Sequence, residues 1–464
     1  MRRPRAHAWS TDRNPWVSDS SASDSALGSL FTPWDDRPIG QVHAAIAAAY
    51  GVPRAFVSTN GTTTANRLAL YTLLNPGEHV LVERDCHISI LQTIVEIGAL
   101  PVWLVPPFAV DLGINLAALP EALAAQLDRA PQIRAVVLTS PKYFGVVGDL
   151  PGCIAACHRR GVPVLVDEAH GACLAFHPAL PASAVHAGAD LVTQSTHKLT
   201  EAWSQGAVLL FNNAALTDRF LQALHGIAAV STSFNYGIVA SVEEAITNLT
   251  QYGARRLEVA LRLAQALRDG IGQVPGLATW GAEQADRPGF VALDATRVTV
   301  NVTGLARTGI DVKARLAQRY RHLPPVVAEL GDTQNVLFLV GYGNRRRDIA
   351  TLLAHLHALA ASRPAAAHAG PVPAAPRVLP PRALDPRAAY WAVARGQTHR
   401  VSVAGAIGQI AGETVAVYPP GNALVVQGEV VLAEVVDYLQ QMATLGAHLK
   451  GASDPAFRTM RILA

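Results

Sequence analysis

Polar residues follow two apolar runs that are typical of buried strands. Asp167 and His170 come after the run VPVLV, and the motif STHK, with Ser195, His197 and Lys198, comes after a later run. In a parallel sheet the carboxyl ends of the strands face the ligand crevice, so we expect both groups at one edge. There a lysine can form an imine with an aldehyde, and an aspartate can keep a pyridine nitrogen protonated. The pairing predicts a site for pyridoxal 5′-phosphate (PLP).

Taken singly, these residues have simpler interpretations. A lysine after a strand is usually a solvated loop residue, and Asp167 could cap a helix. The prediction therefore rests on the combination, because Lys198 would hold the aldehyde while Asp167 makes the ring an electron acceptor.

A third segment is suited to phosphate. STNGTTTAN separates an apolar strand from a predicted helix, so Gly61, Thr62 and Thr63 lie where backbone N–H groups and hydroxyls converge at a helix N-terminus. An ordinary threonine-rich helix cap is the alternative. Ser195 and His197, at another strand end, favour phosphate binding.

His87 lies in RDCHISI, directly after the predicted strand HVLVE. From that position an imidazole could stack on a planar aromatic cofactor over the same crevice. The alternative is a half-buried histidine with ordinary hydrogen-bond partners.

The elements that must position these residues are short and regular. From residue 42 to 211, β-branched runs alternate with amphipathic stretches, which predicts an α/β fold with a mostly parallel sheet. Seven runs are predicted strands: 55–57, 80–82, 102–105, 135–138, 162–166, 191–193 and 208–211. We assign residues 1–41 to an N-terminal arm and residues 42–296 to a PLP-binding large domain.

Two smaller domains are predicted downstream. Residues 297–361 combine the runs VTVNV and VLFLV with helical patterns, as in a small α+β domain. Residues 362–381 are rich in alanine and proline and are predicted to be a linker. A C-terminal α+β domain follows at residues 382–464.

Composition excludes several classes of partner. Half of the 464 residues are hydrophobic and 16% are charged, as in a compact enzyme. There are 38 Lys and Arg against 35 Asp and Glu, and the basic residues are scattered, so no nucleic acid is expected. For the triplet Arg345-Arg346-Arg347, a solvated loop or helix start is favoured over a phosphate-binding patch. No apolar run reaches about 18 residues, so we expect no membrane span.

The cysteines indicate a reducing compartment. Four cysteines do not make a disulfide framework, which favours the cytoplasm. Cys153, Cys157 and His158 could share a helix face as metal ligands, but buried small side chains are the favoured interpretation and no metal is expected. The basic N-terminus lacks the apolar stretch of a signal peptide.

Several motifs, in this order and spacing, resemble the bacterial ornithine/lysine/arginine decarboxylase family. They are STNGTTTAN, RDCH, SPKYFGVVGDL, VPVLVDEAHGA, STHK with WSQG, STSFNYG, and the C-terminal YPPG and QGE. The resemblance runs from about Ser18 to Glu429. It implies PLP-dependent fold type I, the aspartate-aminotransferase fold, in a short form without the N-terminal wing domain.

The resemblance also implies residue roles. Lys198 would form the Schiff base, Asp167 would pair with the pyridine nitrogen, Ala169 and His87 would hold the two ring faces, and His170 would border the site. Thr62, Thr63, Ser195 and His197 would hold the phosphate, and Lys198 or His197 would return a proton to the substrate. Ser231 and Thr232 would complete the phosphate site of a neighbouring subunit, so a homodimer or a higher homo-oligomer with shared active sites is implied.

The implied reaction is decarboxylation of ornithine, lysine, arginine or a derivative to its amine, with Glu429 on the distal cation of the substrate. Some positions depart from the family pattern: Ile88 replaces a lysine, Lys142 a threonine and Gln427 a proline, and the GHK-type N-terminal loop is absent. An inward Lys142 could hold a carboxylate, or it could face solvent. The alternative function is therefore another PLP reaction on the same scaffold, namely transamination, elimination, oxidation or C–C bond formation in a specialised pathway. A catalytically idle subunit is disfavoured because the cofactor residues are retained.

Overall fold

The computed structural model describes residues 27–228, 231, 235–320, 322–362, 376, 378–418 and 421–464. The chain divides into two compact units. The first comprises the described residues within Met1–Asn75, Leu123–Pro141 and Leu150–Arg255, and the second those within Pro76–Ala122, Lys142–Asp149 and Arg256–Ala464. Most of the predicted linker and much of the predicted N-terminal arm lie outside the described residues.

The main sheet has seven strands in the order β1-β10-β9-β8-β6-β2-β3. Their bounds are β1 (Arg54–Ser58), β2 (His79–Glu83), β3 (Leu100–Leu104), β6 (Ile133–Thr139), β8 (Val164–Asp167), β9 (Leu191–Gln194) and β10 (Ala207–Phe211). The pairs β2/β3, β6/β8 and β8/β9 are parallel, and β10 runs antiparallel to β1 and β9. The predicted mostly parallel, seven-stranded sheet is confirmed.

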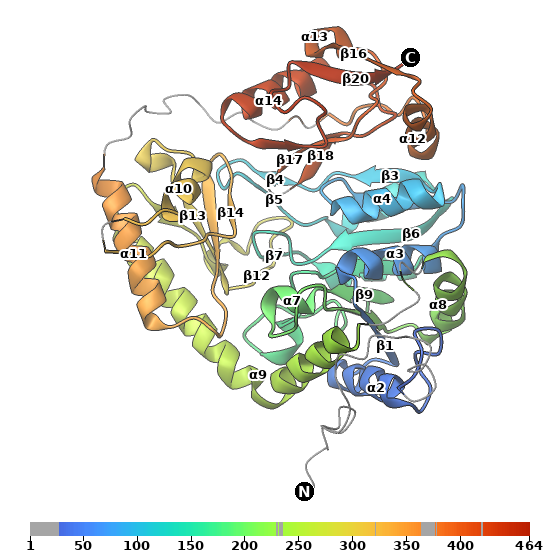
Figure 1. Ribbon diagram of the computed structural model, residues 1–464, viewed down its shortest axis with the longest axis horizontal. Coiled ribbons are helices and arrows are strands. Elements are labelled where there is room, and N and C mark those ends of the chain that lie inside the picture. The colour runs from blue at the N-terminus through green and yellow to red at the C-terminus, as the bar shows by residue number, and fades with distance from the viewer. Residues whose placement is uncertain are drawn as a thin grey trace, which may run out of the picture. The chain divides into compact units, whose positions relative to one another are not determined.

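Burial explains why these runs form strands. Every residue of β8, β9 and β10 is buried, as expected for strands covered on both faces. The helices of the first unit are α2 (Pro38–Tyr50), α3 (Gly61–Leu73), α6 (Leu150–His158), α7 (Thr196–Leu199) and α8 (Thr217–Ala223). The long helix α9 (Tyr236–Ile271) follows them (Figure 1).

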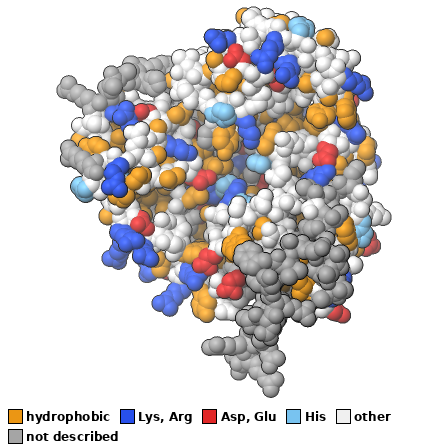
Figure 2. Space-filling view, viewed as in Figure 1, with side chains coloured by type: hydrophobic (Ala, Val, Ile, Leu, Met, Phe, Trp, Pro, Cys, Tyr) orange, Lys and Arg blue, Asp and Glu red, His pale blue; other side chains and the backbone are white. Residues whose placement is uncertain are grey.

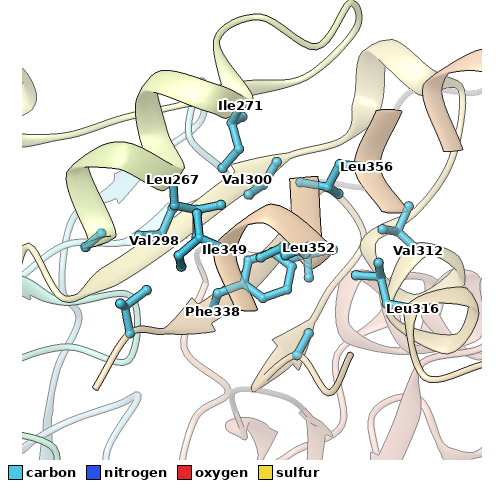
Figure 3. Packing of buried hydrophobic residues seen from close by; sticks show 14 of the residues in the cluster. Leu267, Ile271, Val298, Val300, Val312, Leu316, Phe338, Ile349, Leu352 and Leu356 are labelled. Atoms are coloured by element: carbon cyan, nitrogen blue, oxygen red, sulfur yellow. The ribbon is translucent and has the colours of Figure 1, made fainter. Parts of the chain in front are cut away.

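The region predicted to form a small domain contributes to an antiparallel sheet with the order β11-β13-β15-β14, whose first strand lies before residue 297. Its elements are β11 (Ala278–Thr279), β13 (Arg297–Asn301), α10 (Gly309–Leu316), β14 (Leu330–Gly331), β15 (Asn335–Leu339) and α11 (Arg346–Ala361). Figure 3 shows Val298 and Val300, which lie on one face of β13, packed with Phe338 and with Leu352 and Leu356 of α11. The predicted α+β character of this region is confirmed.

The C-terminal region has a core of its own. Its elements are α12 (Pro386–Ala394), β16 (Thr398–Ser402), α13 (Val403–Ala406), β17 (Val415–Tyr418), β18 (Asn422–Val425), α14 (Ala433–Thr444), β19 (His448–Lys450) and β20 (Thr459–Leu463). Strand β16 pairs with β20, and β17 lies between β18 and β19. Val435, Val436 and Leu439 of α14 are buried in this core.

The remaining elements of the second unit are short. They are α4 (Ile88–Ile97), the hairpin of β4 (Phe108–Ala109) and β5 (Ile114–Asn115), and the pair of β7 (Val146–Val147) and β12 (Ala292–Leu293). Helix α5 (Pro120–Arg129) contains a boundary between the units, because residues up to Ala122 belong to the second unit and residues from Leu123 belong to the first.

Charged side chains of both signs are dispersed over the face seen in Figure 2. Arg345 is the N-cap of α11, and the Arg347 side chain is 75% exposed, which agrees with a solvated helix start. Cys86, Cys153, Cys157 and Cys173 are buried free thiols. Among the described helices, none combines the length and apolar character that a membrane crossing requires. The described part of the chain also holds no group of three or more His, Cys, Asp or Glu side chains suited to a metal ion.

Candidate active site

Lys198 lies on the short helix α7, which begins directly after β9 with Ser195 as its N-cap. The Lys198 side chain is exposed, and its Nζ atom lies 3.0 Å from Nε2 of His170. His170 comes from the loop after β8, the parallel neighbour of β9. The two strand ends singled out in the sequence therefore meet, and they bring an amine and an imidazole close enough to share a proton.

Asp167 is the last residue of β8 and is 3% exposed. Its Oδ2 accepts from Asn66 Nδ2 at 3.0 Å, and its Oδ1 accepts from the Ala169 backbone N–H at 3.0 Å. Asn66 Oδ1 in turn accepts from Thr193 Oγ1 at 2.6 Å. Because Thr193 is paired in register with Asp167, this relay fixes the carboxylate in one orientation at the strand end.

Hydroxyl groups gather at the N-terminus of α3. Thr62 Oγ1 lies 2.6 Å from Ser195 Oγ, and both residues are buried. Gly61 begins the helix with φ of +72°, a backbone conformation that is strained for residues with a side chain. A Cβ atom at this position would meet no other atom within 4 Å. The helix has no side-chain cap, and Thr63 in its first turn is exposed. This donor set fits a phosphate group.

His197 is held by the backbone of Gly206. Its Nδ1 lies 2.8 Å from the Gly206 carbonyl oxygen, and its backbone N–H donates to the same oxygen. Since a carbonyl only accepts, Nδ1 carries a proton and donates, which leaves Nε2 to act on a ligand. A Cβ on Gly206 would approach Val242 Cγ2 to 2.8 Å, so glycine is required at this close approach.

The phosphate segment assigned to the neighbouring subunit is only partly described. Ser231 is exposed, whereas Thr232 lies outside the described residues.

Glu168, the residue after Asp167, is a buried carboxyl that sequence reasoning passed over. It accepts from Ser183 Oγ, from the Ala184 N–H and from Gln194 Nε2 at 2.6–2.7 Å. Burial raises the pKa of Glu168 to about 7, although these hydrogen bonds act to lower it. Glu168 thus connects the end of β8 to the end of β9 from within the core.

In the second unit, His87 is the N-cap of α4. Its Nδ1 accepts from the Ser89 backbone N–H at 3.2 Å and lies 2.7 Å from Ser89 Oγ. An Nδ1 that accepts a hydrogen bond places the proton of the neutral ring on Nε2. The helix start therefore sets the tautomer of His87.

Lys142 is 4% exposed and does not face solvent. Its Nζ lies 2.8 Å from Glu83 Oε1 and 2.8 Å from Asp85 Oδ1. Burial alone would lower the pKa of Lys142, but the two carboxylates outweigh it and hold the pKa above its usual value. The ammonium group is therefore engaged by two side-chain carboxylates of the chain.

Glu429 is 2% exposed and forms an ion pair with Arg84. Both carboxylate oxygens accept from the guanidinium, at 2.6 Å and 2.7 Å. This partner follows a buried strand 345 residues earlier in the chain. The residues around Arg84 and Glu429 in the sequence give no indication of this ion pair.

Comparisons with known proteins agree on one family. The model of the Orn/Lys/Arg decarboxylase major domain matches residues 12–348, and that of the C-terminal domain of the same decarboxylases matches residues 372–454. An arginine decarboxylase of Halalkalibacterium halodurans is 32% identical over 425 residues, which cover 90% of this chain and 83% of the relative.

Solved structures show the same fold. The constitutive lysine decarboxylase of E. coli has a TM-score of 0.79 at 21% identity, over 96% of this chain and 75% of that one. A structure of serine palmitoyltransferase (SPT) with PLP has a TM-score of 0.52 at 20% identity, over 69% of this chain and 75% of that one. The chain belongs to the Orn/Lys/Arg decarboxylase family, PLP-dependent lyases of fold type I that decarboxylate basic amino acids.

Proposed function

We propose that the protein decarboxylates a basic amino acid to its amine, with arginine as the first candidate substrate. The observation that carries the proposal is the pair of parallel strand ends, where β8 presents the oriented carboxylate of Asp167 and β9 leads into Lys198. Arginine comes first because the relative at 32% identity is named an arginine decarboxylase.

The cofactor residues are assigned from their contacts. When bound, PLP supplies a conjugated ring that takes up the electron pair of the bond broken at the α-carbon. Lys198 would hold the aldehyde carbon, and Asp167 would keep the pyridine nitrogen protonated. Asn66 and the Ala169 N–H would fix the orientation of that carboxylate through their hydrogen bonds. Ala169 and His87 keep the ring-facing roles that the family resemblance implies.

The phosphate would be held by the hydroxyls of Thr62, Thr63 and Ser195, by N–H groups at the start of α3 and by His197. The supporting observation is the 2.6 Å contact of the Thr62 and Ser195 hydroxyls, which come from different elements. His197 would act through Nε2, because its Nδ1–H group donates a hydrogen bond to the Gly206 carbonyl oxygen.

Proton transfer is assigned to the residues around Lys198. Loss of carbon dioxide leaves the α-carbon to gain one proton, and Lys198 Nζ or His197 would deliver it. His170, 3.0 Å from Lys198 Nζ, can accept a proton from the ammonium group and so leave a neutral amine able to attack a carbonyl carbon.

A homodimer is proposed as the minimal active unit, in which Ser231 and Thr232 complete the partner's phosphate site. Trp203 and Tyr252, on the unit that carries Lys198, are 59% and 51% exposed, and aromatic residues are enriched at protein–protein interfaces. The cytoplasm is the proposed location, because the few cysteines are free thiols.

The test is product analysis by mass spectrometry after the PLP-loaded protein has been incubated, anaerobically and in air, with arginine, lysine and ornithine. We expect loss of carbon dioxide from one of them without oxygen, absence of product with Lys198→Ala, and normal product with the matched control Lys313→Ala. Deamination or an oxygen-dependent product would instead establish another PLP reaction on this scaffold.

A further inference from the structure

The segment Glu83–His87, which joins β2 to α4, is anchored by successive side chains. Glu83 and Asp85 both accept from Lys142 Nζ, and Asp85 also accepts from Asn115 Nδ2 at 3.2 Å. The Arg84 backbone N–H donates to the carbonyl of Leu104. The Arg84 side chain is the member of this segment that reaches the C-terminal region.

Glu429 offers no acceptor site to a further ligand. Oε1 accepts from Arg84 Nη1 at 2.6 Å and from Trp103 Nε1 at 3.0 Å. Oε2 accepts from Arg84 Nη2 at 2.7 Å and from the Val426 N–H at 2.7 Å. A carboxylate has about four lone-pair sites, so these four donors fill it.

Arg84 is held as completely as its partner. Its Nε donates to the carbonyl of Ala423 at 3.0 Å, its Nη2 donates to the carbonyl of Leu424 at 3.3 Å, and its guanidinium carbon lies 4.5 Å from the ring centre of Trp103. The Arg84 side chain is 10% exposed and that of Glu429 3%. A buried, bidentate pair of this kind fixes geometry, because neither charge can be left alone in the interior.

We propose that Glu429 is a positioning residue: through Arg84 it fixes the segment that leads into His87 and α4, instead of binding the distal cation of the substrate. The proposal rests on the proposed function for the role of His87. Arg84 is three residues from His87, and both belong to the turn between β2 and α4, so a displaced guanidinium shifts the backbone that orients the imidazole.

The two roles for Glu429 predict different kinetics. A positioning residue affects all substrates alike, whereas a ligand for the distal cation affects only substrates that carry it. We therefore compare arginine with citrulline, its neutral analogue, in Glu429→Gln and in the matched control Glu434→Gln, whose side chain is exposed in the same region. For a compound that is not turned over, the inhibition constant replaces KM.

We expect Glu429→Gln to lower kcat by about 100-fold, the loss that follows a shift of about 1 Å, and to leave the relative affinity for arginine and citrulline within about twofold. Its PLP absorption and circular dichroism bands should also change, because the surroundings of the ring change. A selective loss of arginine affinity by about 100-fold, with unchanged cofactor bands, overturns the proposal.

Hydrogen exchange of the holoenzyme gives a second measurement that needs no turnover. Peptides from residues 84–97 should exchange faster in Glu429→Gln than in the wild type or Glu434→Gln. Unchanged exchange refutes the positioning role, even if the wild type decarboxylates no amino acid, which would refute only the proposed function. Should Glu429→Gln fail to fold, Arg84→Lys keeps the charge but loses the bidentate contact, and faster exchange in it supports the proposal while unchanged exchange refutes it.

Discussion

At the scale of single residues, the orientation of Asp167 depends on a side chain that no pattern in the sequence singles out. Asn66 lies within the motif STNGTTTAN, on α3, and donates to Asp167 while it accepts from Thr193. The motif predicts a helix start with donors for phosphate. The inward direction of Asn66, in the second turn of α3, follows only from the packing of α3 on β8 and β9.

Asn66→Ala should weaken PLP binding, because Asp167 loses one of its two hydrogen-bond donors. Hydrogen bonds to charged groups contribute about 1.5–3 kcal/mol, so the dissociation constant of PLP should rise by about 10- to 100-fold. Titration of the apoprotein with PLP, followed by absorbance, measures this. Asn248→Ala, which alters a half-buried asparagine of α9, is the control, and equal affinity in both variants would remove Asn66 from the cofactor site.

Lys142→Met should destabilise the protein, because it leaves Glu83 and Asp85 buried without their cation. Breaking a buried ion pair from one side costs about 3–5 kcal/mol. Urea unfolding of the holoenzyme measures the change, with Lys313→Met as the control for loss of a lysine. Normal stability together with a raised KM would instead indicate that Lys142 binds the carboxylate of the substrate.

At the scale of elements, the seven strands were predictable because each contains a short apolar run that is buried among similar runs in the sheet. The meeting of the residues that follow β8 and β9 was predictable as well, because a parallel sheet brings the carboxyl ends of its strands to one edge. The partners of Lys142 and Glu429 were not predictable, because each depends on a side chain far away in the sequence. A charge pattern does not say which of many carboxylates a buried cation meets.

His43 joins α2 to β1 and to the loop residue Pro33, and it should make the packing of these segments sensitive to acid. On α2, its Nδ1 lies 2.6 Å from the Pro33 carbonyl, and its Nε2 accepts from the Val57 N–H of β1 at 3.1 Å. Burial lowers the pKa of His43 to about 4, from 6.5. The neutral ring therefore contributes stability that is complete above pH 6.5 and is lost as the pH falls toward 4.

Chemical unfolding of the wild type and of His43→Gln between pH 7.5 and pH 4.5 tests this contribution. The wild type should lose its stability advantage over the variant as the pH falls, because only the unfolded chain readily protonates His43. A difference between the two proteins that does not change with pH would contradict the assigned pKa.

At the scale of the whole molecule, the proposed homodimer makes a prediction about mixed chains. If Lys198 of one chain and Ser231 of the other build each site, a chain with Lys198→Ala and a chain with Ser231→Asp are each inactive alone, the second because its carboxylate repels the partner's phosphate. In a hybrid dimer, one site then receives both altered residues and the other receives two unaltered ones. Random exchange of equal amounts makes half of the dimers hybrid, so the mixture should regain about a quarter of the wild-type activity.

The same mixture with Asp167→Ala in place of Ser231→Asp is the matched control. Asp167 ends β8, and Lys198 follows the neighbouring strand β9 of the same chain, so both sites of that hybrid carry a defect and no activity should return. Rescue in the first mixture alone establishes a site shared between chains. Without rescue in either, after exchange of subunits has been verified, each chain must hold the phosphate with its own hydroxyls, those of Thr62 and Ser195, which already lie 2.6 Å apart within one protomer.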